Sequence, residues 1–141
     1  MFVGEARRSR QLAGTAMMIV KNYVAPSNIQ GVGVFAGEDI KQGTRIYEFV
    51  EGVDIVMTRE QAAAYGTEFA RFMRIFAYVD PADRTMVISV DNSRFMNHAD
   101  EPNTGWDEQF GWATRDIGKG EEITCDYYTF WFEPPFASPS E

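Results

Sequence analysis

The grouping of apolar residues restricts the fold of this chain more than any other feature of its sequence. From about residue 17 onward these residues occur in short runs rich in β-branched and aromatic side chains, with turn-forming residues between them. Runs of this kind are typical of short β-strands joined by turns. The pattern therefore predicts a mainly β domain, with strands in residues 17–24, 32–40, 44–52, 75–80, 85–91, 110–113 and 122–127.

One segment departs from this β pattern and predicts a helix. Thr58 and Gln61 have the spacing of a capping box, in which each side chain accepts a hydrogen bond from the other residue's backbone N–H group. Residues 62–65 follow with good helix propensity, and Gly66 should break or bend the helix before residues 68–76 continue it. We therefore expect one short helical insertion among the strands.

The length and the cysteine content favour a single domain without metal or disulfide cross-links. A chain of 141 residues can bury a hydrophobic core of its own. Cys125 is the only cysteine and His98 the only histidine, so neither a disulfide within the chain nor the usual four-ligand zinc site can be built. We expect no metal site and an intracellular, cytoplasmic location.

We expect this domain to occupy residues 17–132, between two loose tails. Residues 1–16 are polar and basic, and only short apolar patches follow them, whereas a signal peptide requires an apolar stretch. Residues 133–141 are rich in proline and serine and should fray. No uninterrupted apolar run reaches the length that spans a membrane, so we expect no membrane partner.

The net charge narrows the classes of partner. Thirteen basic and twenty-one acidic residues give a formal charge of −8, whereas a nucleic-acid-binding surface would be basic. The charge suits a cationic partner such as a Lys/Arg-rich peptide, although solubility alone explains it at least as well. We therefore expect no direct binding of nucleic acid.

Three motifs in a fixed order carry the clearest functional information. They are GVG at residues 31–33, RFMNH at residues 94–98 followed by a PN pair, and GEEITCDY at residues 120–127. A glycine pair alone is common in turns and has little meaning, but the second and third motifs are rare and occur here in sequence. Together they resemble the motifs of the SET-domain family, and the similarity runs from about residue 18 to about residue 131.

The resemblance implies a fold, a cofactor and a reaction. The SET fold, also called a β-clip, has several small sheets and a C-terminal pseudoknot, in which the third motif threads past the second. Members transfer a methyl group from S-adenosyl-L-methionine to the side-chain amine of a protein lysine, and they release S-adenosyl-L-homocysteine. This chain cannot build the cysteine-rich zinc regions of many relatives. It thus resembles small bacterial or viral members, and we expect a lysine-containing protein or peptide as its substrate.

The resemblance also implies which residues hold the cofactor. Glycines allow the backbone to approach it closely, and an asparagine amide can both donate to and accept from its amino-acid end. For the histidine imidazole, a structural role is a better explanation than general-base catalysis. The residues expected to bind the cofactor are Gln30, Gly31, Val32, Gly33, Arg94, Phe95, Asn97, His98 and Trp131.

Tyr127 is the expected catalytic residue. By resemblance its hydroxyl orients the methyl group and the attacking nitrogen, while as a phenol it is a poor general base at neutral pH. We expect Trp106, Cys125 and Tyr128 to line the substrate channel. Cys125 occupies a position where relatives often have Phe or Tyr, and Trp106 could fill the space that it leaves. The two glutamates of the third motif are interpreted as a feature of a surface turn.

Two other functions stay open from the sequence. A catalytically silent SET-fold binding module is favoured by the small residue Cys125 and the missing zinc region, whereas the retained Asn97 and Tyr127 speak against it. A methyltransferase for a small amine would suit the short insertion over residues 58–76. The short insertion also suggests a shallow substrate groove, which a second copy of the chain could complete in a homodimer.

Overall fold

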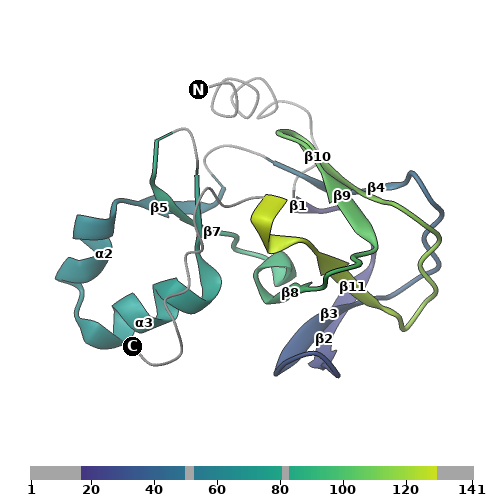
Figure 1. Cartoon of the computed structure of the whole chain (residues 1–141), viewed down its shortest axis with the longest axis horizontal. Coiled ribbons are helices and arrows are strands. Elements are labelled where there is room, and N and C mark those ends of the chain that lie inside the picture. The colour runs from purple at the N-terminus through teal and green to yellow at the C-terminus, as the bar shows by residue number, and fades with distance from the viewer. Residues whose placement is uncertain (1–16, 50–52, 81–82, 130–141) are drawn as a thin grey trace.

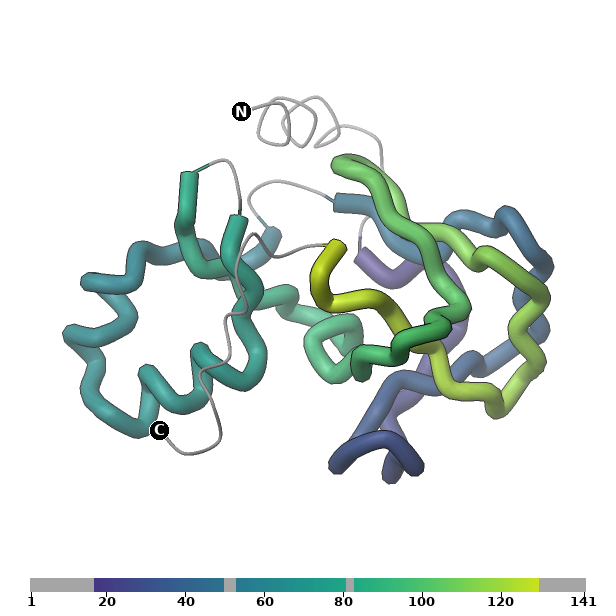
Figure 2. Tube along the Cα trace, viewed as in Figure 1, coloured from purple at the N-terminus to yellow at the C-terminus, as the bar shows by residue number. Residues whose placement is uncertain are grey.

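The computed structural model describes residues 17–49, 53–80 and 83–129. The chain forms two lobes that lie side by side (Figure 1). The larger lobe contains most of the strands, and the smaller lobe is the insertion that carries the helices. The last described element, the 3-10 helix η2 (Tyr127–Thr129), lies between the two lobes (Figures 1 and 2). Both predicted tails fall outside the described residues.

Two four-stranded sheets build the larger lobe. The first is wholly antiparallel and has the order β1 (Met17–Met18), β4 (Arg45–Glu48), β10 (Phe110–Ala113) and β9 (Thr104–Trp106). The second has the order β2 (Asn22–Pro26), β3 (Val32–Ala36), β11 (Glu122–Cys125) and β8 (Asn97–His98). In this sheet β11 pairs antiparallel with β3 and parallel with β8. The predicted mainly β architecture of several small sheets is confirmed.

The smaller lobe combines a third sheet with two α-helices. Its strands have the order β5 (Ile55–Met57), β7 (Met86–Ile88) and β6 (Tyr78–Val79), and all pair antiparallel. The helices are α2 (Arg59–Ala64) and α3 (Thr67–Phe76). The insertion is therefore larger than the single helical segment that the sequence predicts. No helix among the described residues is long and apolar enough to cross a membrane.

The predicted capping box begins α2. The Thr58 hydroxyl accepts from the Gln61 N–H at 3.1 Å, and the Gln61 side chain accepts from the Thr58 N–H at 2.8 Å. Gly66 follows with φ 100°, which a residue with a Cβ rarely adopts, and α3 starts directly after it. Both the start of the helix and its interruption are thus confirmed.

Most predicted strands extend beyond the observed ones, and for two of them the structure gives the reason. The predicted strand over residues 17–24 divides into β1 and β2, because the Ile19 N–H donates to the Ile46 carbonyl while the Lys21 N–H donates to the Glu38 carboxylate. The chain leaves one sheet and enters the other between these two bonds. The predicted strand from residue 75 starts only at Tyr78, because α3 extends through Phe76.

Each lobe has a hydrophobic cluster of its own. Val34, Ile46 and Ile123, from β3, β4 and β11, are fully buried in the larger lobe. Met73 of α3 and Ile88 of β7 are buried in the smaller lobe. Because the two clusters are separate, the space between the lobes is not filled by a common core.

The parallel pair of β11 and β8 brings the third sequence motif beside the second. Thr124 lies opposite Asn97, and Cys125 lies opposite His98. Asn103, which is fully buried, strengthens this junction: its amide donates to the Glu122 carbonyl at 2.8 Å, and its carbonyl accepts from the Thr124 N–H at 2.9 Å. This parallel neighbourhood is what the predicted pseudoknot requires.

Asn103→Ala should destabilise the fold by about 2–4 kcal/mol, because two buried backbone groups of β11 lose their hydrogen-bond partners. Chemical denaturation monitored by tryptophan fluorescence measures the change. Asn28→Ala, at an exposed turn position, is the matched control and should stay within about 0.5 kcal/mol of wild type. Equal stability of the two variants would contradict the role assigned to Asn103.

Candidate functional site

The candidate site is a cavity between the two lobes. It opens to solvent, and its empty volume, with the open mouth included, is about 560 Å³. Both lobes and the 3-10 helix η1 (Asn92–Phe95) contribute to its walls. The lining residues are Tyr47, Phe49, Ile75, Phe76, Tyr78, Ser89, Ser93, Arg94, Met96, Trp106, Cys125 and Tyr127.

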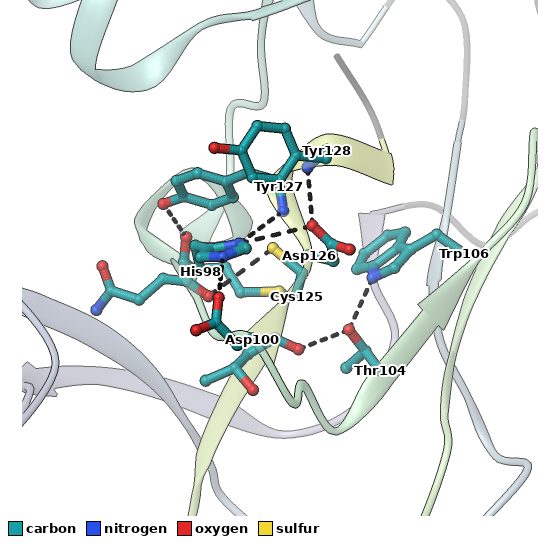
Figure 3. Close-up of polar contacts among 11 residues, drawn as sticks. His98, Asp100, Thr104, Trp106, Cys125, Asp126, Tyr127 and Tyr128 are labelled. Atoms are coloured by element: carbon teal, nitrogen blue, oxygen red, sulfur yellow. Dashed lines mark hydrogen bonds and ion pairs between the residues drawn. The ribbon is translucent and has the colours of Figure 1, made fainter. Parts of the chain in front are cut away.

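Tyr127 is held at both its backbone and its hydroxyl (Figure 3). The hydroxyl donates to the Met96 carbonyl at 2.7 Å, and the Tyr127 N–H donates to the His98 Nδ1 at 3.1 Å. Because the carbonyl takes the hydroxyl hydrogen, the lone pairs of the phenol oxygen stay available to accept. Burial raises the pKa of the Tyr127 phenol, so the group stays protonated at neutral pH and is suited to orienting a ligand rather than removing a proton.

The hydrogen bonds of His98 determine which nitrogen carries its proton. Since Nδ1 accepts from the Tyr127 N–H, the hydrogen of the ring is on Nε2, which lies 3.1 Å from the Asp100 carboxylate and donates to it (Figure 3). Both ring nitrogens are therefore engaged, Nδ1 by the backbone of η2 and Nε2 by the Asp100 carboxylate. This arrangement agrees with a structural role for the imidazole.

Trp106 and Cys125 both line the cavity. The indole N–H of Trp106 donates to the Thr104 hydroxyl at 2.7 Å (Figure 3). The indole ring packs against Tyr47 with 5.3 Å between ring centroids. Gly111 leaves room for the ring, since a Cβ at this position would lie 2.6 Å from it. Cys125 is 3% exposed. The structure thus brings together these two residues that the sequence assigned to a substrate channel.

The sequence did not reveal several other residues that line the cavity. The Tyr47 hydroxyl lies 3.4 Å from the Ser89 hydroxyl, and Phe49 and Tyr78 also contribute to the lining. Burial raises the pKa of Tyr47 well above its ordinary value, and the carboxylate of Asp54 adds to the increase. These residues belong to strand-like apolar segments, and no sequence signal separates a residue that lines a cavity from one that fills a core.

The glycine turn meets the second motif through Asn97, which is 7% exposed. The Asn97 amide nitrogen lies 3.1 Å from the Gln30 carbonyl and 3.0 Å from the Val32 carbonyl. Gly31 has φ 49°, in the left-handed region. A Cβ at Gly33 would lie 2.2 Å from the Glu122 carboxylate. Five of the predicted cofactor residues are therefore adjacent here, together with a glutamate that the sequence assigned to a surface turn.

The remaining predicted site residues lie apart from this turn. Arg94 lines the cavity with its guanidinium 4.8 Å from the centre of the Phe95 ring, while Phe95 packs against Phe76. Tyr128 is 68% exposed, packs edge-on against His98 and is not among the residues that line the cavity. The reason is the 3-10 geometry of η2, which turns successive side chains about 120° apart. The predicted residue Trp131 falls outside the described residues.

Comparisons with known proteins agree on one domain. The family model described as SET domain matches residues 31–128. Two proteins named "Histone-lysine N-methyltransferase, H3 lysine-36 specific" are similar in sequence: that of Candida albicans is 29% identical over 76% of this chain, and that of Debaryomyces hansenii is 34% identical over 74%. The matched region covers 14% and 16% of these two relatives, so the chain spans only a small part of their length.

Solved structures show the same fold. The Neurospora SET domain protein DIM-5, a histone lysine methyltransferase, superposes with a TM-score of 0.52 and 22% identity over 79% of this chain and 53% of its own. A humanized mutant of the Chaetomium thermophilum Polycomb Repressive Complex 2 gives a TM-score of 0.60 and 21% identity over 86% of this chain and 16% of its own.

The raised pKa of Tyr127 gives a spectroscopic prediction. Between about pH 9 and about pH 11, where an ordinary tyrosine ionises, wild type and Tyr127→Phe should have the same phenolate absorbance, because Tyr127 stays protonated. The folded state binds this proton more tightly than the unfolded state does. The contribution of Tyr127 protonation to the free energy of unfolding is therefore complete below about pH 10 and declines at higher pH. A lower absorbance of Tyr127→Phe than of wild type in this pH range would contradict the burial of this phenol.

Proposed function

The chain belongs to the SET-domain family, and on this premise we propose that it transfers a methyl group from S-adenosyl-L-methionine to the side-chain amine of a lysine in a protein. The observation that carries the proposal is the position of Tyr127. Its side chain lines a cavity with aromatic walls, its hydroxyl donates to the Met96 carbonyl, and its backbone N–H donates to His98. The same two segments reach the glycine turn through Asn97.

The residues around the glycine turn fit the cofactor. The absence of a Cβ at Gly33 leaves room for the Glu122 carboxylate beside the turn, and the Gln30 and Val32 carbonyls offer acceptors to the ammonium of an amino acid. When bound, S-adenosyl-L-methionine supplies an electrophilic methyl group on its sulfonium. The residues proposed to hold it are Gln30, Gly31, Val32, Gly33, Arg94, Phe95, Asn97 and His98, with Trp131 as a further proposed contact.

The cavity favours the reactive form of the substrate. A lysine amine must lose its proton before it can attack a methyl group, and its ordinary pKa is about 10.4. An apolar cavity lowers this pKa because burial disfavours the charged form. The phenol oxygen of Tyr127 can then accept an N–H of the amine, so that the nitrogen lone pair is aligned for transfer. Trp106 and Cys125, which both line the cavity, set the space around that nitrogen.

A protein substrate fits the charge and the architecture better than a small amine does. The formal charge of −8 attracts basic peptides, and Ile75 and Phe76 of the smaller lobe extend the cavity wall beyond Tyr127. Relatives of the domain are named for lysine 36 of histone H3. We therefore propose the basic tail of a histone, or a peptide of similar charge, as the first substrate to test.

Tyr127→Phe should lower kcat by about 100-fold, because the amine loses the oxygen that aligns it, while the Kd for S-adenosyl-L-methionine stays within about twofold. Mass spectrometry of histone-tail peptides measures the transfer, and calorimetry measures the affinity. Tyr128→Phe is the matched control, since its ring lies outside the cavity lining, and it should retain nearly full activity. Wild type that binds the cofactor but methylates no peptide would favour the silent binding module instead, and transfer to free amines only would contradict a protein substrate.

A further inference from the structure

Three hydrogen-bond acceptors converge on a single nitrogen beside the glycine turn. The Asn97 amide nitrogen lies 3.1 Å from the Gln30 carbonyl, 3.0 Å from the Val32 carbonyl and 3.0 Å from the Glu122 Oε2. An amide nitrogen has two hydrogens, so one acceptor more is present than this donor can serve. The orientation of the amide is settled by its surroundings, because a flipped amide would direct its oxygen at three acceptors.

The carboxylate of Glu122 is held in this position by its neighbours. The Ser27 hydroxyl donates to the Glu122 Oε1 at 2.7 Å, and the same Ser27 oxygen accepts from the Ile29 N–H at 2.9 Å. Gly33 leaves the space that the carboxylate occupies. The interpretation of Glu122 as a surface-turn residue is therefore wrong, because its side chain extends from β11 across β3 to the turn.

The charge of this carboxylate is not neutralised by a protein cation within the described residues. Its recorded partners, Ser27 and Asn97, are both neutral donors. A carboxylate and two carbonyls around one point form a site of negative potential, and a primary ammonium matches it with a positive charge and three N–H groups. An anion or an apolar group would be disfavoured at the same point.

We propose that Glu122 binds the α-ammonium of S-adenosyl-L-methionine, and that it makes the site selective for cofactors that carry this group. The inference rests on the proposed function and adds a residue to it. The ammonium binds the three acceptors that surround the Asn97 amide nitrogen in this structure. The Asn97 amide then rotates toward the α-carboxylate of the cofactor. Ser27 keeps the carboxylate in place.

The test compares two ligands that differ in this one group. Calorimetry measures the affinity of S-adenosyl-L-homocysteine and of an analogue in which hydrogen replaces the α-amino group, on wild type, Glu122→Gln and Glu121→Gln. Wild type should prefer the amino ligand by about tenfold or more, as expected for a charged hydrogen bond. Glu122→Gln should remove most of this preference, with little change for the analogue. Glu121→Gln, whose carboxylate instead pairs with Arg115 at 2.7 Å, should leave both affinities unchanged.

Other outcomes overturn the inference and separate it from the proposed function. If Glu122→Gln lowers the affinity for both ligands equally, the glutamate has a purely structural role. If it leaves the affinity for S-adenosyl-L-homocysteine unchanged, the glutamate is not part of the site. If wild type binds neither ligand, the proposed function fails as well. Ser27→Ala is a second variant, which keeps the charge of Glu122 but removes the hydroxyl that holds its carboxylate in place. It should lower the affinity for S-adenosyl-L-homocysteine more than the affinity for the analogue. An equal effect on both affinities would contradict the proposal.

Discussion

The parallel pairing of β11 with β8 is the contact on which the rest of the site depends. Parallel neighbours require a long connection, and here β9 and β10 form part of it. The pair places Thr124 opposite Asn97 and Cys125 opposite His98, so that the chain leaves β11 directly beside the second motif. Without this register the Tyr127 hydroxyl could not reach the Met96 carbonyl, and Glu122 could not reach the glycine turn.

Two chemically different regions meet at this pair. On one side, aromatic rings from both lobes surround Tyr127 in an apolar cavity, which suits an amine that must lose its proton. On the other side, carbonyl and carboxylate oxygens gather around Asn97, which suits a charged amino-acid end. The second motif belongs to both, because Met96 lines the cavity and the Asn97 side chain contacts the turn. The proposed transfer needs such a division, since donor and acceptor must approach from opposite directions.

Local signals in the sequence were sufficient for some of these features and not for others. The capping box at Thr58 was predictable because both of its bonds are formed within four residues. The position of Tyr128 outside the cavity depends on the 3-10 turn after β11, which has no clear sequence signature. The role of Glu122 depends on a contact with Ser27, far away in the chain. Tyr47 lines the cavity only because the two lobes leave a space between them. The apolar pattern of a strand is the same whether its side chains line a cavity or fill a core, so the sequence could not predict this role.

The most direct test of a cofactor site built from these motifs is a calorimetric titration of wild type and Asn97→Ala with S-adenosyl-L-methionine. Thermal unfolding of both proteins verifies that the variant is folded, and Asn22→Ala on strand β2 at the other edge of the same sheet is the control. The account predicts saturable one-to-one binding by wild type and by the control, and its loss in Asn97→Ala, because the link between the glycine turn and the second motif is removed. Undiminished binding by a folded Asn97→Ala, or no binding by wild type, would contradict it.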